Sequence, residues 1–461
     1  VLRPADQAIH EVVSELGELG DGRVSQNPSH LECHGRDEGW RPVCAPQAVF
    51  YPHSTAEVVA GVRACAERAI PVIPFGAGTS IEGQIMASFG GVTFAMSRMD
   101  GLLTVHTEDF YCRVQPGITR GALNTALRDT GLFFPIDPGA DATIGGMAST
   151  RASGTNAVRY GTMRDAVMGL EVVLATGEVI RTGARTRKSA AGLDLTALFV
   201  GAEGTLGVIT ELTIRLHALP EAFATAVATF PDLRSAVETV AAIMQSGMSV
   251  GRIEFLDELY AQALSRFEGL DLPEAPLLLI EFSGMRGFVT LQAAAAAELA
   301  RDHGALQINH TSDPDERSRL WRARHRAYWA GLKLRPGSRA IVTDVCVPMS
   351  VLVESVVAAQ EDFRHHELIG PILGHVGDGN FHATILVDPA DSQQIERAEA
   401  AHERLVLRAL QVGGTCTGEH GIGLGKRRYL EIEHGTAVSS MRAIKQALDP
   451  RGIFNPGKML S

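Results

Sequence analysis

The chain has 461 residues, of which 45% are hydrophobic and 21% are charged, and its formal net charge is −11. With a mean hydropathy near zero, it is typical of a folded protein and is long enough for more than one domain. The acidic balance argues against nucleic-acid binding and against attraction to anionic lipid. A small anionic substrate would therefore need a local basic pocket.

The sequence contains no apolar run near the roughly 18 residues that a membrane-spanning helix requires. The best candidate, 293–300, is short and is followed by charged residues. The six cysteines include no CxxC pair, which favours reduced thiols and a protein of the cytoplasm, with an organelle matrix as the alternative. Peripheral association with membrane electron carriers is left open, as is a leader removed before Val1.

The first part of the chain alternates short β-rich runs with helical ones. Residues 1–44 are expected to form an N-terminal arm with a helix around 8–16. From residue 45, the alternation indicates an α/β layer, and we assign 45–220 to one domain. The strands and helices expected in this domain are 49–51, 55–67, 72–74, 91–94, 111–114, 118–129, 167–174 and 208–216.

After Leu219-Pro220 the composition changes to strands separated by Ala-rich amphipathic helices. This pattern predicts a substrate domain over 221–412 with an antiparallel sheet. The segment 413–461 is expected to carry two helices and to return to the first domain. The fold class expected for the whole chain is therefore α+β. The elements expected here are 224–230, 233–245, 252–255, 257–267, 276–283, 288–303, 426–433 and 437–448.

A glycine-rich loop follows the strand expected at 72–74. Its glycines allow backbone N–H groups to point together at an anion, which is the nest geometry that binds phosphates. The loop is not a GxGxxG motif, because Ile81 stands at the third glycine, and it lacks the GK[ST] of a P-loop. An ordinary turn is the alternative. The candidate binding residues are Pro74, Gly76, Ala77, Gly78, Thr79, Ser80 and Gly83.

A second tract of small residues covers 137–161. Small residues permit close backbone packing against a large flat ligand, and the hydroxyls and amides can donate hydrogen bonds along it. A tightly packed loop of a large sheet is the alternative, but together the two tracts favour a cofactor site. The candidates are Pro138, Gly139, Asp141, Thr143, Gly145, Gly146, Ser153, Gly154, Asn156, Tyr160 and Gly161.

At these residues the chain resembles the flavoprotein family whose FAD domain is shared with vanillyl-alcohol oxidase and p-cresol methylhydroxylase. The resemblance implies an FAD domain of two α/β subdomains, in which the PFGAGTS loop holds the pyrophosphate and the second tract lines the rest of FAD. It also implies that Val208 and Ile209 reach the adenine side. Members of this family that attach the flavin covalently often do so through a His in the pyrophosphate loop. In this chain Thr79 and Ser80 stand in that loop, so the resemblance implies non-covalent FAD.

Two histidines flank Asp378-Gly379, a strong signal for a two-residue hairpin turn. In such a hairpin His375 faces His382, with Cβ atoms roughly 4.5 to 5.5 Å apart. Both imidazoles would then project from one face and could bind one divalent ion. The alternative is a hydrogen-bonded pair of core histidines.

Glu419 and His420 are adjacent in a glycine-rich loop. Glu419 can supply the carboxylate that completes a two-His-one-carboxylate set, which leaves open positions for a substrate. His420 is the natural general base, since its unperturbed pKa is about 6.5. A solvated turn is the alternative.

Together, HVGDGNFH and GTCTGEHGIGLGKR resemble the C-terminal half of the FAD-linked D-2-hydroxyacid dehydrogenases, and the resemblance covers nearly all of 45–461. It implies that His375, His382 and Glu419 bind one divalent metal ion, of which Zn, Mn and Fe are all compatible with these ligands. It also implies that His420 is the catalytic base.

Arg324 and Tyr328 are four residues apart in a helical stretch, so one helix would carry them on one face. The guanidinium could then bind a substrate carboxylate beside an aromatic wall. An exposed basic helix is the alternative. The resemblance implies that Arg324 binds the carboxylate and that Tyr328 sets specificity. It further implies that Asn455 approaches the flavin.

These observations predict an FAD-dependent enzyme that oxidises a short D-2-hydroxy acid. D-lactate is the first expectation, because 343–348 looks most like the D-lactate members; glycolate or D-2-hydroxyglutarate is the alternative. A different class is a non-catalytic flavin-fold subunit of an oxidase complex. The expected electron acceptor is cytochrome c, a quinone or an electron-transfer flavoprotein, and a homodimer is left open.

Overall fold

The computed structural model describes residues 3–460, which form two compact units. The first unit contains the described residues up to Ser153, then Gly161–Leu219, and the chain from Glu419 onward. The second unit contains Gly154–Tyr160 and Pro220–Gly418. The chain therefore passes from one unit to the other four times.

The first unit begins with a four-stranded sheet in the order β1-β2-β4-β3. Its elements are α1 (Asp6–Gly17), β1 (Val24–Ser25), α2 (Pro28–Cys33), β2 (Ala48–Phe50), α3 (Thr55–Glu67), β3 (Val72–Phe75), β4 (Val92–Ala95) and the 3₁₀ turn η1 (Met96–Arg98). Strands β2, β4 and β3 are parallel, and α3 is the crossover between β2 and β3, as parallel strands require. Ser54 begins α3 by accepting a hydrogen bond from the Glu57 N–H.

The C-terminal segment completes this part of the first unit. It contains α16 (Arg427–His434) and α17 (Ala437–Leu448). The Val72 N–H donates to the Ile453 carbonyl at 2.8 Å, and the Asn455 N–H donates to the Val72 carbonyl at 2.9 Å. The expected return of the C-terminal segment to the first domain is therefore confirmed.

The rest of the first unit is built on a five-stranded antiparallel sheet in the order β5-β6-β10-β8-β9. Its elements are β5 (Leu102–His106), β6 (Tyr111–Val114), α4 (Arg120–Leu127), η2 (Arg128–Thr130), β7 (Leu132–Phe133), α5 (Ile144–Thr150), α7 (Met163–Ala166), β8 (Val167–Val173), β9 (Val179–Gly183), α8 (Leu195–Phe199), β10 (Val208–Arg215) and β11 (His217–Ala218). Buried residues of α4, α5, β8 and β10 form one hydrophobic core. This core holds the start of α5 beside the start of β10.

The second unit is built on an eight-stranded sheet whose pairs are all antiparallel, in the order β15-β12-β14-β13-β18-β19-β16, with β17 also paired to β19. Its elements are α6 (Ala157–Tyr160), β12 (Ala222–Thr229), α9 (Leu233–Gln245), β13 (Val250–Leu256), α10 (Glu258–Glu268), β14 (Leu277–Gly284), α11 (Arg286–Asp302), β15 (Gln307–Thr311), α12 (Pro314–His325), α13 (Ala327–Leu332), β16 (Arg339–Val342), β17 (Val345–Cys346), η3 (Met349–Val351), α14 (Leu352–His365), β18 (Ile372–Gly374), η4 (Val376–Asp378), β19 (Asn380–Val387) and α15 (Ser392–Gln411).

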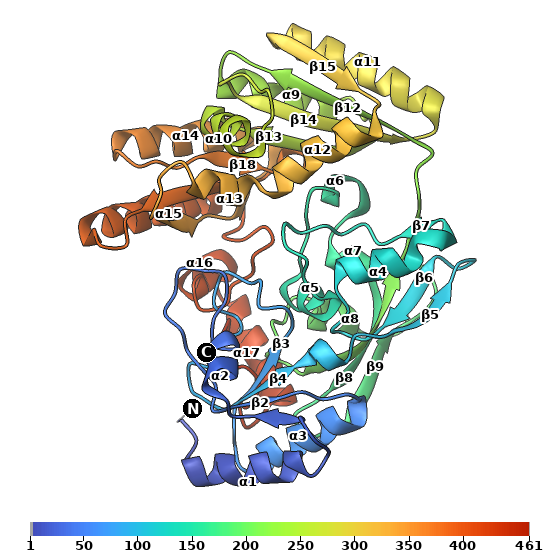
Figure 1. Ribbon diagram of the computed structural model, residues 1–461, viewed down its shortest axis with the longest axis vertical. Coiled ribbons are helices and arrows are strands. Elements are labelled where there is room, and N and C mark those ends of the chain that lie inside the picture. The colour runs from blue at the N-terminus through green and yellow to red at the C-terminus, as the bar shows by residue number, and fades with distance from the viewer. Residues whose placement is uncertain (1–2, 461) are drawn as a thin grey trace. The chain divides into compact units, whose positions relative to one another are not determined.

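Helices cover this sheet, as Figure 1 shows for α11 beside β12 and β14, and α9 packs against β13. Buried residues of α10, α12 and α13 form a hydrophobic core with β13 and β14. The expected α+β class, with an antiparallel sheet in the second unit, is confirmed.

No helix within residues 3–460 is both long enough and apolar enough to cross a membrane. All six cysteines are free thiols.

Candidate active site

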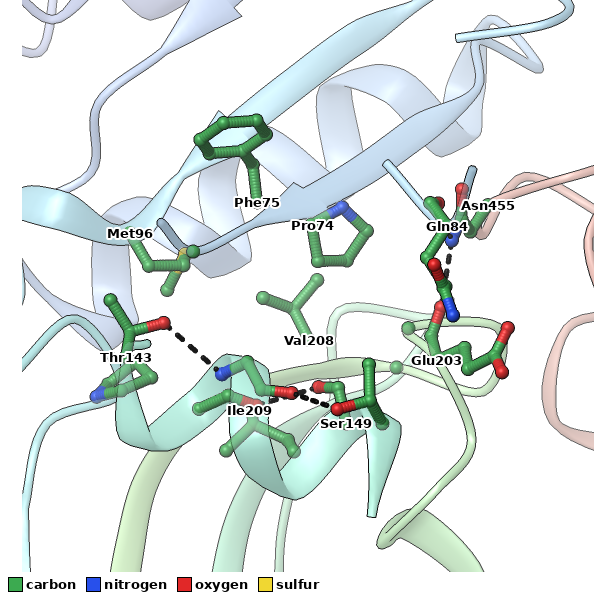
Figure 2. A pocket seen from close by; sticks show the side chains of 17 residues that line it. Pro74, Phe75, Gln84, Met96, Thr143, Ser149, Glu203, Val208, Ile209 and Asn455 are labelled. Atoms are coloured by element: carbon green, nitrogen blue, oxygen red, sulfur yellow. Dashed lines mark hydrogen bonds between the residues drawn. The ribbon is translucent and has the colours of Figure 1, made fainter. Parts of the chain in front are cut away.

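A pocket in the first unit lies beside the end of β3, the start of α5 and the start of β10. The space between these elements, open solvent included, is about 570 Å³. Figure 2 shows Pro74 and Val208 on facing sides, with Thr143 toward one end and Glu203 and Asn455 toward the other. The residues predicted from sequence that line it are Pro74, Gly76, Thr143, Gly145, Gly146, Val208, Ile209 and Asn455.

Glycines let the backbone segments around this pocket approach closely. A Cβ atom on Gly76 would lie 2.2 Å from Oγ1 of Thr143, and one on Gly145 would lie 2.5 Å from Cβ of Pro116. Thr143 begins α5 by accepting a hydrogen bond from the Gly146 N–H at 3.3 Å. The walls are therefore mainly backbone and apolar side chains, which fits a large, flat cofactor.

Other candidates from the two glycine tracts lie elsewhere. Asp141 accepts a hydrogen bond from the Gly121 N–H at 2.8 Å, at the start of α4. Asn156 accepts one from Nε of Arg252 at 2.7 Å within the second unit. Those in the first unit that do not line the pocket are Ala77, Gly78, Thr79, Ser80, Gly83, Pro138, Gly139, Asp141, Ser153 and Gly161. Those in the second unit are Gly154, Asn156 and Tyr160.

Three polar side chains form one end of the pocket: Gln84, Glu203 and Asn455. The Asn455 amide donates to the carbonyls of Gln84 and Glu203, both at 2.8 Å. The Glu203 carboxylate is 4% exposed and accepts hydrogen bonds from the N–H groups of Ile422, at 2.6 Å, and Gly423, at 2.8 Å. Burial raises the pKa of Glu203 to about 7, although these N–H groups act to lower it.

Of these three residues, sequence reasoning found only Asn455. Gln84 is a single polar residue at the end of a glycine-rich loop, and no motif marks it. Glu203 stands in the stretch EGTLG just before β10, where a charge beside two glycines was the only available signal.

The loop that carries Glu419 and His420 is anchored to the first unit mainly through its backbone. Gln84 donates a hydrogen bond from Nε2 to the His420 carbonyl at 2.6 Å, and Glu203 holds the turn that follows. Ser153 donates to Oε2 of Glu419 at 2.7 Å. The side chains of Glu419 and His420 are 12% and 22% exposed, so both can reach solvent from a fixed backbone.

The prediction of a two-residue hairpin between the histidines of the second unit is wrong. His382 on β19 pairs with Leu373 on β18, and the chain between these strands forms the 3₁₀ turn η4. The predicted turn needs positive φ at both Asp378 and Gly379, and only Gly379 has it, with φ 78°. The observed pairing differs from the predicted pairing by two residues. Because side chains alternate with a period of two, each side chain stays on the predicted face of the sheet. The rings of His375 and His382 are therefore still close, with centroids 5.5 Å apart.

The ring contacts of these buried histidines identify their tautomers. Nδ1 of His382 is 3.1 Å from the Thr343 carbonyl, which can only accept, so Nδ1 carries the proton. Nδ1 of His375 is 2.7 Å from Oε1 of Glu254, and an ionised carboxylate is also only an acceptor. Each ring then has its lone pair on Nε2, as in metal-binding histidines.

The helix predicted to carry both Arg324 and Tyr328 is broken, so that prediction is wrong. Helix α12 ends at His325, Arg326 leaves the helical conformation with ψ 3°, and α13 begins at Ala327. The break lets α13 turn to pack against α10, where Gly331 lies close to the ring of Tyr260.

Arg324 is buried and forms an ion pair rather than lying exposed on a helix. It is 7% exposed, its Nε donates to Oε2 of Glu254 at 2.8 Å, and its Nη2 is 2.5 Å from the same oxygen. Burial acts to raise the pKa of Glu254, but Arg324 and His375 outweigh it and the net shift is downward. Tyr328 packs edge-on against Trp329, with ring centroids 5.0 Å apart.

Two family models match this chain. One is described as an FAD binding domain and matches residues 46–183. The other is described as the C-terminal domain of FAD linked oxidases and matches residues 219–459, more than half of the chain. The chain belongs to the FAD-linked oxidase family. The FAD-binding match falls mostly within the first unit and includes the part of the pocket lined by residues 74–150.

Curated relatives match this FAD-linked oxidase over almost its whole length. A probable mitochondrial D-lactate dehydrogenase of Danio rerio is 48% identical over 98% of this chain and 92% of the relative. A mitochondrial cytochrome D-lactate dehydrogenase of Arabidopsis thaliana is 42% identical over 98% of this chain and 81% of the relative. A glycolate oxidase subunit of Bacillus subtilis is 35% identical over 90% and 89%. Two of these names specify mitochondria, which does not match the expected cytoplasmic location.

Solved structures share the fold of this FAD-linked oxidase. p-Cresol methylhydroxylase has a TM-score of 0.82 at 19% identity and covers 100% of this chain and 99% of its own. Alkyldihydroxyacetonephosphate synthase has a TM-score of 0.79 at 20% identity and covers 99% and 87%. The FAD-domain resemblance expected from the glycine tracts is confirmed at the level of the fold.

Proposed function

We propose that this FAD-linked oxidase is a dehydrogenase that oxidises D-lactate to pyruvate. The observation that carries the proposal is the match, over 98% of the chain, to two relatives named as D-lactate dehydrogenases at 42% and 48% identity. The presence of a glycolate oxidase subunit among the relatives favours glycolate as the second candidate substrate.

We propose that FAD binds non-covalently in the pocket of the first unit. When bound, FAD accepts a hydride from the substrate carbon. Gly76 and Gly145 keep the backbone close enough for the pocket to have flat walls. Asn455 ties together the backbone at Gln84 and Glu203 and so fixes the polar end of the pocket. Release of yellow flavin on denaturation would establish that the attachment is non-covalent.

We propose that His375 and His382, together with Glu419, hold one divalent metal ion. A bound divalent ion acts as a Lewis acid that eases ionisation of the substrate hydroxyl. The fit rests on the two Nδ1–H tautomers, which direct the Nε2 lone pairs away from the protein partners of each ring. Among the described side chains, Oδ1 of Asn380 is also buried without a hydrogen bond, as expected beside a cation.

We propose that His420 removes the substrate hydroxyl proton. Its carbonyl is fixed by Gln84, while its partly exposed imidazole can accept a proton. Arg324 is proposed to bind the substrate carboxylate. Glu254 engages its Nε and Nη2, so the substrate would bind the Nη1 side of the guanidinium. Tyr328 is proposed to limit the size of the substrate.

The electron acceptor is proposed to be a protein or quinone of a respiratory chain. One relative carries the word cytochrome in its name, which favours cytochrome c over a quinone or an electron-transfer flavoprotein. Steady-state reduction of each acceptor by D-lactate would rank them. Self-association as a homodimer stays a prediction that light scattering would test.

The proposed function is tested by anaerobic titration of the purified protein with D-lactate, L-lactate, glycolate and D-2-hydroxyglutarate. The oxidised flavin band should bleach at the lowest concentration with D-lactate. Preferential bleaching by glycolate or D-2-hydroxyglutarate would keep the reaction and overturn the substrate. A protein that binds no flavin, even after FAD is added, would overturn the enzyme and favour a non-catalytic subunit.

A further inference from the structure

Glu254 lies within β13 of the second unit, and its side chain is fully buried. A carboxylate in a protein interior is costly unless it is paired and hydrogen-bonded. Oε1 of Glu254 is 2.7 Å from Nδ1 of His375. Oε2 accepts from Nε of Arg324 at 2.8 Å. Each oxygen therefore contacts a different residue of the proposed active site.

The neighbouring strand β14 provides a natural comparison at Glu281, which is 2% exposed. Glu281 accepts hydrogen bonds from Nε and Nη2 of Arg317, at 2.5 and 2.9 Å, and from the indole N–H of Trp321 at 2.7 Å. Both glutamates thus neutralise an arginine on α12. Glu254 differs because its second oxygen binds an imidazole.

We propose that Glu254 is a positioning residue that couples metal binding to substrate binding. Through Oε1 it keeps His375 as the Nδ1–H tautomer, so that the Nε2 lone pair is available to the metal. Through Oε2 it holds the guanidinium of Arg324 in one orientation for the substrate carboxylate. This inference rests on the proposed function, in which His375 is a metal ligand and Arg324 binds the substrate.

Replacing Glu254 by glutamine separates these two tasks, because an amide has one acceptor oxygen and one donor nitrogen. If the amide oxygen faces His375, the NH₂ group opposes the guanidinium of Arg324. If the oxygen faces Arg324, the NH₂ group donates to Nδ1 of His375 and moves the ring proton to Nε2, which blocks metal binding. The first orientation sets two donors against each other at a buried cation, whereas the second costs only a change of His375 tautomer, so the second orientation is favoured and metal binding is the task that fails.

The test measures the zinc dissociation constant of the FAD-loaded protein after chelator treatment, by competition with a chromophoric chelator. We expect Glu254→Gln to bind zinc about 10- to 100-fold more weakly than the wild type, the usual effect of losing the hydrogen-bond partner of a ligand. Glu281→Gln is the matched control, since it also removes a buried carboxylate bound to an α12 arginine, and its zinc affinity should not change. An unchanged zinc affinity in Glu254→Gln, or equal weakening in both variants, would overturn the proposal.

Two further measurements keep the proposal testable if Glu254→Gln does not fold. The double variant Glu254→Leu with Arg324→Met removes the unpaired charge together with any acceptor for Nδ1 of His375, so its zinc affinity should remain weakened. Long-range ¹H–¹⁵N spectra of histidine-labelled wild type, with His375→Gln to assign the signal, should show the Nδ1–H tautomer at His375. A His375 ring protonated only at Nε2 would overturn the proposal.

Failure of this inference can be separated from failure of the proposed function. Flavin bleaching by D-lactate tests the reaction without reference to Glu254. A wild type that bleaches and binds zinc, beside a Glu254→Gln variant with the same zinc affinity, would reject Glu254 alone. A wild type that bleaches but binds no zinc would reject the metal site and this inference with it.

Discussion

The two units each bury a glutamate beside the residues proposed for catalysis, and they stabilise it in opposite ways. Glu203 in the first unit accepts hydrogen bonds from neutral donors, the N–H groups of Ile422 and Gly423 and the Gln84 side chain, and burial raises its pKa to about 7. Glu254 in the second unit contacts Arg324 and His375, and its pKa is lowered in spite of complete burial. Neutral donors are therefore too weak to offset the loss of water at Glu203, where Glu82 adds a like charge, whereas Arg324 and His375 together are sufficient at Glu254.

This contrast extends to the sites around the two glutamates. The first unit forms its pocket from glycines and main-chain hydrogen bonds, which suits a large cofactor held by many weak contacts. The second unit uses charged side chains arranged in ion pairs, which suits the binding of a small anion or a metal ion. Mutations should therefore be tolerated differently in the two units, and four predictions test this difference.

The largest effect is expected for His420→Ala, which should lower kcat by roughly 10²- to 10⁴-fold, as for loss of a general base. Because the loop is anchored through its backbone at Gln84 and Glu203, FAD should stay bound at wild-type stoichiometry. Stopped-flow flavin reduction and the visible spectrum measure the two quantities. Loss of FAD together with activity would show that the side chain also supports the loop.

Glu254→Gln should lower the free energy of unfolding at pH 7 by about 3 to 5 kcal/mol, because it leaves the charge of Arg324 buried and unpaired. Urea denaturation followed by circular dichroism measures the loss. The double variant with Arg324→Met should recover most of it. A single variant as stable as the wild type would mean that water reaches Arg324 and that the ion pair is dispensable.

Whereas Glu254→Gln should lose stability relative to the wild type, Glu203→Gln should gain stability relative to the wild type as pH rises. From pH 4.5 to about 7 the unfolded wild type loses the Glu203 proton while the folded protein keeps it, so the free energy of unfolding falls as pH rises. Glutamine does not titrate, so the free energy of unfolding of the variant lacks this fall with rising pH. The stability of the variant relative to the wild type should therefore increase by about 3 kcal/mol between pH 4.5 and pH 8. A constant difference across this range would place the pKa of Glu203 near its ordinary value.

The smallest effect is expected for Gly76→Ala, whose methyl group would meet Oγ1 of Thr143 at 2.2 Å. Overpacking of this kind costs about 1 to 3 kcal/mol, so FAD affinity should fall about 5- to 150-fold. Gly17→Ala is the control in the same unit, since a methyl group there meets nothing within 4 Å. Quenching of FAD fluorescence on binding gives both affinities, and equal values would exclude close packing at Gly76.

Local signals in the sequence predicted several helices closely. The helices expected at 55–67, 233–245 and 437–448 have the bounds of α3, α9 and α17, because amphipathic periodicity is a local property. The turn between His375 and His382 was predicted wrongly because its geometry depends on tertiary packing: a Cβ on Gly377 would lie 2.6 Å from Ile253 on β13. The break at Arg326 has a similar origin in the packing of α13.

The candidate site was only partly predictable for the same reason. Motifs identified the glycine tracts, the two histidines and the Glu419–His420 pair, because runs of unusual residues stand out in one sequence. Gln84, Glu203 and Glu254 are single residues within ordinary strands and loops, so their importance appears only when the fold gives them partners. A buried charge cannot be recognised before its burial is known.

The contact between β3 and the C-terminal segment has a consequence for biosynthesis. Val72 exchanges hydrogen bonds with Ile453 and Asn455, which leave the ribosome about 380 residues later in the chain. At translation rates of about 5 to 20 residues per second, this interval lasts about 20 to 80 s. The second unit is complete once Gly418 has been made, whereas β3 still lacks its partner and the pocket lacks Asn455 at that point. The pocket is therefore incomplete until Asn455 has been made, although its other walls are encoded about 250 to 380 residues earlier in the chain.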